Sequence, residues 1–356
     1  MSIIHKLPPL GLTNEGLNCY FNAFLQLLYT CDIYESMENI YEDTCINDTI
    51  NGDFKKLPKA LEYKKKILEY LITYAAELQL FYDDKPNIST NDGIPDDKIS
   101  GYILEKFRNL SSISKEYSTG QNDPTEILYS LLEFTGLEIN FRIYKYENVI
   151  CEKQNKSIIK FDQIVAKDIE IKVHIRLLNE KVTEAELVTL LLNTDSGIIP
   201  DAKCSICGGT NCVRMISTPF LLPNNLLLFL GRYKADMVKK KVEFPPLINI
   251  YSKFGYKYVY ELSASVQHSG GYANIAKTGQ STGTYISSTG GHYTCLVKRN
   301  LLVFDCDDSR ARQLNATELK TDEHSLLILY KKIHEEFNKD YIVDDNNIVN
   351  YYYKNN

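Results

Sequence analysis

The sequence lacks any long uninterrupted run of apolar residues. Its run at Leu226–Leu230 is far shorter than the ~18 residues that a membrane-spanning helix needs. Residues 1–12 contain no apolar signal core. An excess of positive charge is also absent, since the formal net charge is −6. We therefore expect a protein that does not span a membrane and does not take nucleic acid as its main partner.

The composition is that of a globular protein, with 44% hydrophobic and 24% charged residues among 356. A chain of this length buries roughly 75% of its unfolded surface, so it can fold without disulfide bonds. The nine cysteines and the missing signal core together predict a reducing compartment, cytoplasmic or nuclear. In such a compartment a cysteine is a metal ligand, a nucleophile or a small core residue.

The pattern of apolar residues predicts helices first and strands later. One helix is expected to begin with Asn18 as N-cap and Cys19 as its first residue, and a second to cover Lys59–Phe81. The segment Asp123-Pro124-Thr125-Glu126 is typical of a helix start, because Asp can cap and Pro suits the first helical position. After Gly136, β-branched and aromatic segments with partial alternation predict strands, the first over Ile139–Tyr146, and one further helix is expected over Glu180–Asn193.

Cys19 is the first candidate for chemistry. A cysteine at a helix N-terminus lies near free backbone N–H groups and the positive end of the helix dipole, which both favour the thiolate. The alternative is a small buried cysteine at a helix start, which is the commoner role of this residue type.

A cysteine nucleophile needs a base, and His292 has the most suggestive setting of the six histidines. It follows Gly290 and Gly291, which allow a close approach of backbone or substrate. The acidic segment Asp305-Cys306-Asp307-Asp308 follows fifteen residues later, and a returning strand would bring a carboxylate beside the imidazole. The alternatives are a structural histidine and a solvated acidic turn.

Six segments together cover nearly the whole chain: Gly11–Gln26, Gly120–Leu132, Leu222–Tyr233, Val242–Pro245, Tyr260–Gly271 and Gly291–Cys295. In this order they resemble the sequence boxes of the ubiquitin-specific proteases, with Gly11–Gln26 as the Cys box and the last two segments as the two parts of the His box. One short motif would be weak evidence, but six in family order are specific.

The resemblance implies an α+β, papain-like fold with a helical thumb, a β-rich palm and β-fingers. The expected catalytic domain is 1–335, with the thumb about 1–137, the fingers about 138–220 and the palm about 221–335, followed by a polar tail, 336–356. The implied function is a deubiquitinating thiol protease that hydrolyses the isopeptide or peptide bond after the C-terminal glycine of ubiquitin. Ubiquitin and ubiquitinated proteins are then the expected partners of a monomeric enzyme. The alternatives are an inactive ubiquitin-binding module and a protease for a ubiquitin-like modifier.

The resemblance also assigns roles to single residues. Cys19 is the implied nucleophile and His292 its base, while Asn14 supplies an oxyanion donor from the position five residues before the cysteine. Asp307 is the preferred third member of the triad, and Asp305 is the alternative if Phe304 is the aligned aromatic residue. Asp308 matches a family position that supports the oxyanion or orients the site.

Substrate contacts are implied at Asp123 and Glu126, whose family counterparts contact arginines in the basic tail of ubiquitin, and at Gly291 and Tyr293. A role as helix caps alone is the alternative for the two acidic residues. The sequence departs from the family at Leu17-Asn18, where Asn-Thr usually precedes the nucleophile. This departure concerns the packing of the loop and leaves the chemical groups in place.

Four further cysteines form a candidate zinc site. Cys204 and Cys207 are spaced like half of a zinc ribbon, and family fingers often unite two such pairs. The second cysteine of the other pair is replaced by Gln154, so Cys151, Cys204, Cys207 and Cys212 would be the ligands of a structural zinc. The alternative is a finger that has lost its metal. The chemistry itself is expected to need no cofactor.

Overall fold

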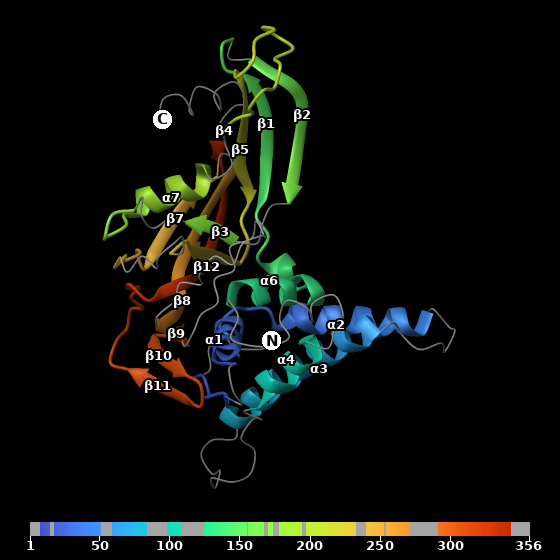
Figure 1. Cartoon of the computed structure of the whole chain (residues 1–356), viewed down its shortest axis with the longest axis vertical. Helices are drawn as coiled ribbons and strands as arrows, with labels where there is room; N and C mark the ends of the chain where they lie inside the picture. Colours follow the sequence, from blue (N-terminus) through green and yellow to red (C-terminus); the bar gives the residue numbers. More distant parts are fainter. Residues whose placement is uncertain are drawn as a thin grey trace, which may run out of the picture.

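The computed structural model describes residues 8–14, 18–50, 59–83, 98–108, 124–154, 156–166, 170–173, 178–193, 197–232, 240–252, 254–270 and 291–342. A group of helices lies against one end of a large sheet, and a second, smaller sheet extends from the other end (Figure 1). None of the helices in the described ranges is long and apolar enough to cross a bilayer.

The helical part comes from residues 19–140. Its central helix, α1, is buried along its whole length, including its polar side chains. The last of these helices stops before Gly136, whose φ of +87° is in the left-handed region. A short 3₁₀ helix, η2, follows directly after this glycine. The elements are α1 (Cys19–Leu28), α2 (Tyr34–Ile50), α3 (Lys59–Asp83), α4 (Ile99–Arg108), α6 (Pro124–Thr135) and η2 (Leu137–Asn140).

The larger sheet has eight strands in the order β11-β10-β9-β8-β12-β6-β3, with β7 paired to β8 outside this path. All of its pairs are antiparallel except β3 with β6. Its strands are β3 (Glu170–Val173), β6 (Asn225–Leu230), β7 (Leu247–Tyr251), β8 (Phe254–Gly270), β9 (Gly291–Arg299), β10 (Leu302–Asp307), β11 (Arg310–Leu314) and β12 (Ser325–Ile342).

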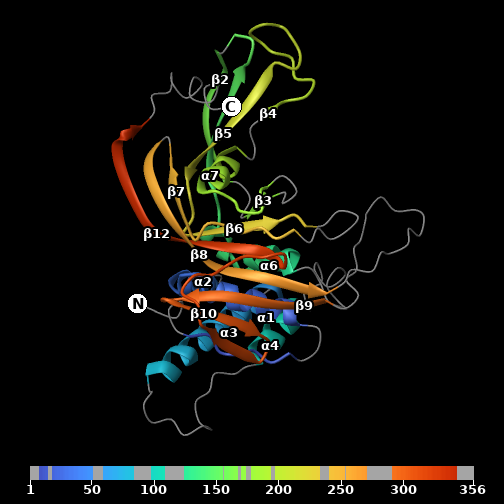
Figure 2. The same ribbon diagram turned by 90° about the vertical axis from the view of Figure 1, so that its left-hand side faces the viewer.

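The smaller sheet has four antiparallel strands in the order β2-β1-β5-β4. It stands at the top of the molecule in Figures 1 and 2, away from the helices, with α7 (Glu184–Asn193) lying near its base. Its strands are β1 (Tyr144–Cys151), β2 (Lys156–Ala166), β4 (Gly197–Ile198) and β5 (Val213–Leu221).

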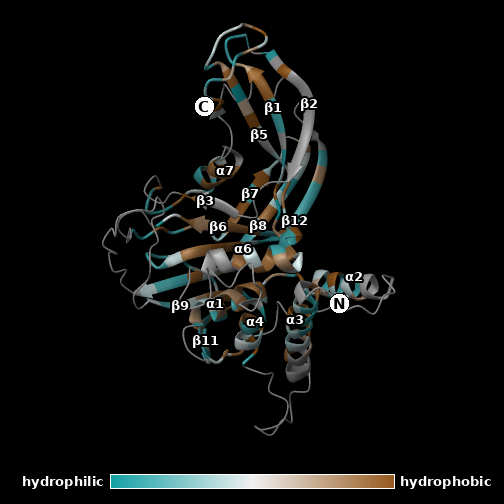
Figure 3. Cartoon of the chain, turned by 45° about the vertical axis from the view of Figure 1, so that its right-hand side comes forward, coloured by the Kyte–Doolittle hydropathy of each residue, from teal (hydrophilic) through white to brown (hydrophobic). Residues whose placement is uncertain are grey.

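The main core lies between the helices and one face of the larger sheet. Phe21, Phe24 and Leu28 of α1 belong to the same buried cluster as Val266 of β8 and Val297 of β9. A second buried cluster covers the other face around β6, β7 and β8. In Figure 3 hydrophobic colour is concentrated on these central strands. The core therefore fixes α1, with Cys19 at its start, against strand β9, with His292 near its start.

The prediction of an α+β chain with helices first is confirmed, and several boundaries differ for identifiable reasons. The strand predicted over Ile139–Tyr146 begins only at Tyr144, because η2 occupies the preceding residues. The helix expected from Glu180 begins at Glu184, because Glu180 and Val182 instead exchange backbone hydrogen bonds with Glu243. Strand β12 continues beyond the expected end of the domain at 335, pairing with β8 as far as Ile342.

Candidate active site

Cys19 is the first residue of α1, as predicted, and only 4% of its surface is exposed. The helix begins where the N–H groups of Phe21 and Asn22 bond to the carbonyl of Asn18. The expected side-chain cap is wrong, because Asn18 Nδ2 instead donates to Ser100 Oγ at 3.2 Å. The Asn18 side chain therefore accepts no hydrogen bond from the backbone N–H groups of the first turn. The positive electrostatic potential of these groups acts on the neighbouring Cys19 sulfur.

His292 and Asp307 meet at the open end of the β9–β10 pair. His292 Nε2 lies 2.5 Å from Asp307 Oδ1, and close to half of each side chain is exposed. The alternative carboxylate, Asp305, is directed elsewhere and accepts a hydrogen bond from Arg312 at 3.1 Å. The carboxylate of Asp307 therefore fixes Nε2 and leaves Nδ1 as the nitrogen that can serve a thiol.

Asp308 connects this pair to the segment before α1. Its Oδ2 accepts a hydrogen bond from Asn14 Nδ2 at 2.9 Å, although 294 residues separate the two in sequence. Asn14 Oδ1 in turn accepts from the N–H of Asn18 at 3.4 Å, next to Cys19. The structure thus brings the predicted residues Asn14, Asp307 and Asp308 together between the start of α1 and the β10–β11 turn.

Asn22 is a member of this group that the sequence did not single out. It lies on α1 one turn after Cys19, and its Nδ2 donates to Asp308 Oδ1 at 2.7 Å. The sequence feature that could have indicated Asn22 is a polar residue on the buried, otherwise apolar face of a helix. Gln26 is a second residue of this kind.

His268 lies directly behind the predicted base. It is fully buried on β8, and its ring lies 4.4 Å, centroid to centroid, from that of Tyr293, its partner on β9. Burial, followed by the neighbouring charges of His324 and His292, lowers its pKa from 6.5 to about 4. A Cβ atom on Gly291 would lie 1.9 Å from His268 Nε2, so this position requires glycine. Gly291 and Tyr293 therefore have a packing role here, and their predicted substrate contacts stay a prediction.

The two acidic residues predicted to meet a basic substrate tail are not tested. Asp123 lies outside the described residues, and of Glu126 only the backbone, in α6, is described. The helix does begin at Pro124, as the capping pattern indicated.

The four cysteines of the candidate metal site come together at the tip of the smaller sheet. Their sulfur atoms all lie within 4.8 Å of one another, and Cys207 Sγ is 3.3 Å from Cys212 Sγ. Cys204 Sγ accepts hydrogen bonds from the N–H groups of Ile206 and Cys207, both at 3.4 Å. Cys151 joins them from the end of β1.

The donor set fits a tetrahedral metal ion. Zn–S bonds of about 2.3 Å place thiolates about 3.8 Å apart, which is within the spacing seen here. Hydrogen bonds from backbone Gly209 and then from Cys212 lower the pKa of Cys207 to about 7, so this thiol loses its proton more readily than an ordinary cysteine. Three sulfur donors from the segment before β5 and one from the end of β1 therefore have the chemistry of a structural metal site.

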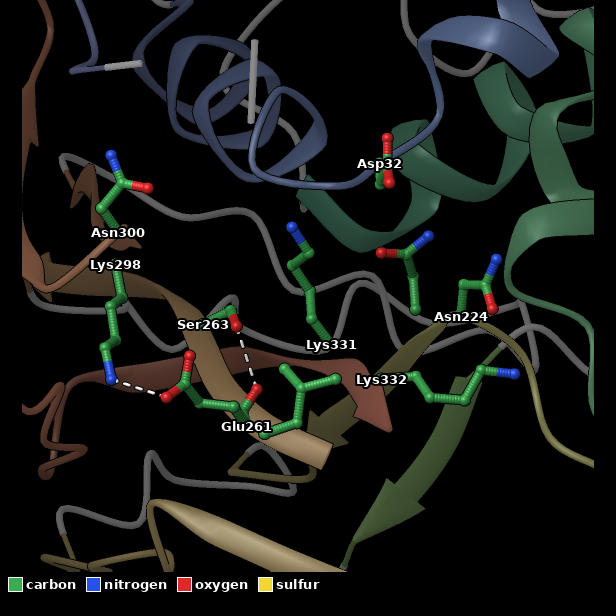
Figure 4. A pocket seen from close by; sticks show the side chains of 10 residues that line it. Asp32, Asn224, Glu261, Ser263, Lys298, Asn300, Lys331 and Lys332 are labelled. Atoms are coloured by element: carbon green, nitrogen blue, oxygen red, sulfur yellow. Dashed lines mark hydrogen bonds and ion pairs between the residues drawn. The ribbon is translucent and has the colours of Figure 1, made fainter. Parts of the chain in front are cut away.

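A cavity of about 540 Å³ lies away from these groups, between the turn after α1 and the sheet (Figure 4). Asp32, Lys298 and Lys331 contribute to its lining. Lys298 is paired with Glu261 in the wall at 2.7 Å. None of the residues predicted for catalysis lines it, so the cavity is separate from the candidate active site.

The fold and the site together define a cysteine hydrolase of α+β type, in which a helix-start cysteine faces a sheet that carries a histidine–carboxylate pair. Residues 10–330 match the family model described as ubiquitin carboxyl-terminal hydrolase. The chain therefore belongs to the ubiquitin carboxyl-terminal hydrolase family, whose members of this kind are cysteine-type deubiquitinases.

Solved structures show the same fold. The chain is similar to Ubp8 chains in a structure of the SAGA DUB module Ubp8/Sgf11/Sus1/Sgf73 bound to monoubiquitin, with 17% identity and a TM-score of 0.61. A second structure of this module, bound to ubiquitin aldehyde, gives 17% identity and a TM-score of 0.60. Both alignments cover 95% of this chain and 71% of the other. No sequence among the curated proteins compared matches the chain. These similarities confirm the predicted papain-like fold.

Proposed function

We propose that this chain is a deubiquitinating thiol protease with Cys19 as nucleophile, His292 as base and Asp307 as the third member of the triad. The observation that carries the proposal is the 2.5 Å contact of His292 Nε2 with Asp307 Oδ1, adjoining the Asp308–Asn14 hydrogen bond that leads back to the start of α1. The substrate is the isopeptide or peptide bond after the C-terminal glycine of ubiquitin, in keeping with the family.

The geometry supports a two-step mechanism. His292, held by Asp307 through Nε2, takes the proton of Cys19 at Nδ1, and the thiolate attacks the scissile carbonyl carbon. The carboxamide of Asn14 and the backbone N–H of Cys19 stabilise the oxyanion, and losing one such donor typically costs about 100- to 1,000-fold in rate. His292 then protonates the leaving amine and afterwards activates the water that hydrolyses the thioester.

An electrophilic ubiquitin probe tests the function. Ubiquitin carrying a C-terminal electrophile should label the wild type at Cys19, and Cys19→Ala should abolish labelling while the melting temperature stays close to that of the wild type. Cys45→Ala, which removes a cysteine far along α2, is the matched control and should label normally. A wild type that binds ubiquitin without labelling would identify an inactive ubiquitin-binding module instead. Labelling only by probes built on a ubiquitin-like modifier would reassign the substrate.

We further propose that the four clustered cysteines hold a structural zinc. Their sulfur spacing and the two N–H···S hydrogen bonds to Cys204 support this assignment. The zinc would tie the end of β1 and the start of β5 to the turn between β4 and β5, and it would take no part in the chemistry, for which the enzyme needs no cofactor.

We propose a helical thumb (about 1–137), fingers (about 138–220) and a palm (about 221–335), and the separation of the helices, the smaller sheet and the larger sheet supports this division. Strand β3 of the palm sheet comes from within the finger segment, and β12 carries the palm on to Ile342. We propose an intracellular, monomeric enzyme. The similar structures hold Ubp8 in modules of four proteins, so sedimentation of the purified chain is the test of the monomer.

A further inference from the structure

Asn22 connects three separate parts of the candidate active site. It is a residue of α1 with only 2% of its surface exposed. Its Nδ2 lies 2.7 Å from Asp308 Oδ1, 3.2 Å from the carbonyl of Leu12 and 3.4 Å from the carbonyl of Thr13. One buried carboxamide therefore joins the nucleophile helix, the segment before it and the β10–β11 turn.

Asp308 accepts hydrogen bonds at both carboxylate oxygens and at its backbone carbonyl. Asn22 donates to one carboxylate oxygen and Asn14 to the other, while the Asp308 carbonyl accepts from the N–H of Leu12 at 2.8 Å. Its φ of +47° lies in the left-handed region, which costs a non-glycine residue free energy although aspartate adopts it more readily than most.

The segment that carries Asn14 is equally confined. A Cβ atom on Gly11 would lie 2.1 Å from the carbonyl oxygen of Ser309, so the segment rests directly on the backbone of the turn. Gln26, one turn further along α1 than Asn22, donates to the carbonyl of Leu10 at 2.6 Å. Gln26 thus anchors the same segment through Leu10 and not through Asp308, which gives a natural comparison with Asn22.

We propose that Asn22 is a positioning residue, which fixes the carboxylate of Asp308 and through it the direction of the Asn14 carboxamide. This inference rests on the proposed function, in which Asn14 donates to the oxyanion. Asn14 has two N–H groups, and the one held by Asp308 determines where the second points. Without Asn22 the Asp308 carboxylate loses one of its two side-chain anchors, and the second N–H of Asn14 loses its alignment with the oxyanion.

The test is a set of kinetic measurements on a fluorogenic ubiquitin substrate, with activity expressed per folded molecule. Asn22→Ala should lower kcat by about 10- to 100-fold, because a misplacement near 1 Å can cost as much as 100-fold. KM should stay within about twofold, since Asn22 does not touch the substrate. Gln26→Ala should lower the melting temperature without a comparable loss in kcat.

The double variant decides between positioning and mere stability. If Asn22 acts through Asn14, Asn22→Ala should add less than about threefold in an Asn14→Ala background, because contributions that pass through one group are not additive. Losses that multiply in the double variant would overturn the proposal. Should Asn22→Ala fold poorly, Asn22→Leu, which keeps a similar side-chain volume but has no donor for Asp308, is measured in the same way. Unchanged activity per folded molecule in both variants would also overturn it. An inactive wild type would instead contradict the proposed function, so the two failures are distinguishable.

Discussion

His292 on β9 and Asp307 at the end of β10 are joined by a 2.5 Å contact between Nε2 and Oδ1. Asp305, two residues earlier on the same strand, faces Arg312 instead. The two carboxylates that the sequence left as alternatives are thus in different environments, and only one of them can orient the base.

This difference predicts opposite outcomes for two matched substitutions. Asp307→Ala should lower kcat by about 100- to 10,000-fold, because no side chain then holds the imidazole in the required tautomer. Asp305→Ala should leave kcat within about threefold, since only a hydrogen bond to an exposed arginine is lost. Steady-state kinetics on a ubiquitin substrate provide the measurement, and an equal loss in Asp305→Ala would refute the assignment.

Gly291 is predicted to be intolerant of any side chain. In Gly291→Ala the new Cβ would lie 1.9 Å from His268 Nε2, so the ring or the strand must move, at a cost of about 1–3 kcal/mol. Thermal unfolding should show this loss together with reduced activity, because His292 is the next residue. Gly197→Ala is the matched control, since a Cβ there would meet nothing within 4 Å. An unchanged melting temperature in Gly291→Ala would contradict the packing at His268.

His268 predicts a loss of stability in mild acid. Its pKa is about 4 in the folded protein against 6.5 in the unfolded chain, so between these values the unfolded state binds more protons. The free energy of unfolding should therefore fall as the pH drops from about 6.5 towards 4. At pH 5 the titration of this group lowers the free energy of unfolding by about 2 kcal/mol relative to neutral pH.

Chemical unfolding at pH 7.5 and pH 5 measures this effect. The control is His268→Gln, which does not titrate, so its stability should fall less over the same interval whatever its absolute value. Equal losses for the two proteins would show that other groups are responsible.

Metal analysis tests the cysteine cluster. Purified protein should contain about one zinc per chain, as a closed four-sulfur site does. Cys207→Ser should lose the metal and lower the melting temperature, whereas Cys45→Ser should change neither. Chelation should destabilise the wild type and leave Cys207→Ser unaffected. A metal-free wild type purified with zinc present would remove the proposal.

The role of a residue could be predicted from the sequence where that role depends on its neighbours in the chain. Cys19 at a helix start, Pro124 at the beginning of α6 and the spacing of Cys204 and Cys207 each depend on a few neighbouring residues, and each could be predicted. The membership of Cys212 in the cluster could also be inferred, because Gln154 left one ligand missing.

Long-range contacts could not be inferred in this way. The hydrogen bond between Asn22 and Asp308 joins residues 286 positions apart, and no local pattern encodes it. Asn18 has a residue type that favours capping, yet its amide bonds to Ser100, 82 positions away, because tertiary contacts override local preference. The length of β12 was missed for a similar reason, since its polar residues beyond 335 are ordered by pairing with β8.

The hydrogen bonds from Asn14 and Asn22 to Asp308 have a consequence for the order of synthesis. Cys19 is synthesised long before the groups that would activate it, since Asp308 follows Asn14 by 294 residues. Until β9 and β10 have been made, a nascent chain therefore carries its nucleophile without a base, without a fixed oxyanion donor and without the turn on which residues 8–14 rest. Folding itself thus acts as the activation step, and incomplete chains that end before β10 should be proteolytically silent without any inhibitor or propeptide.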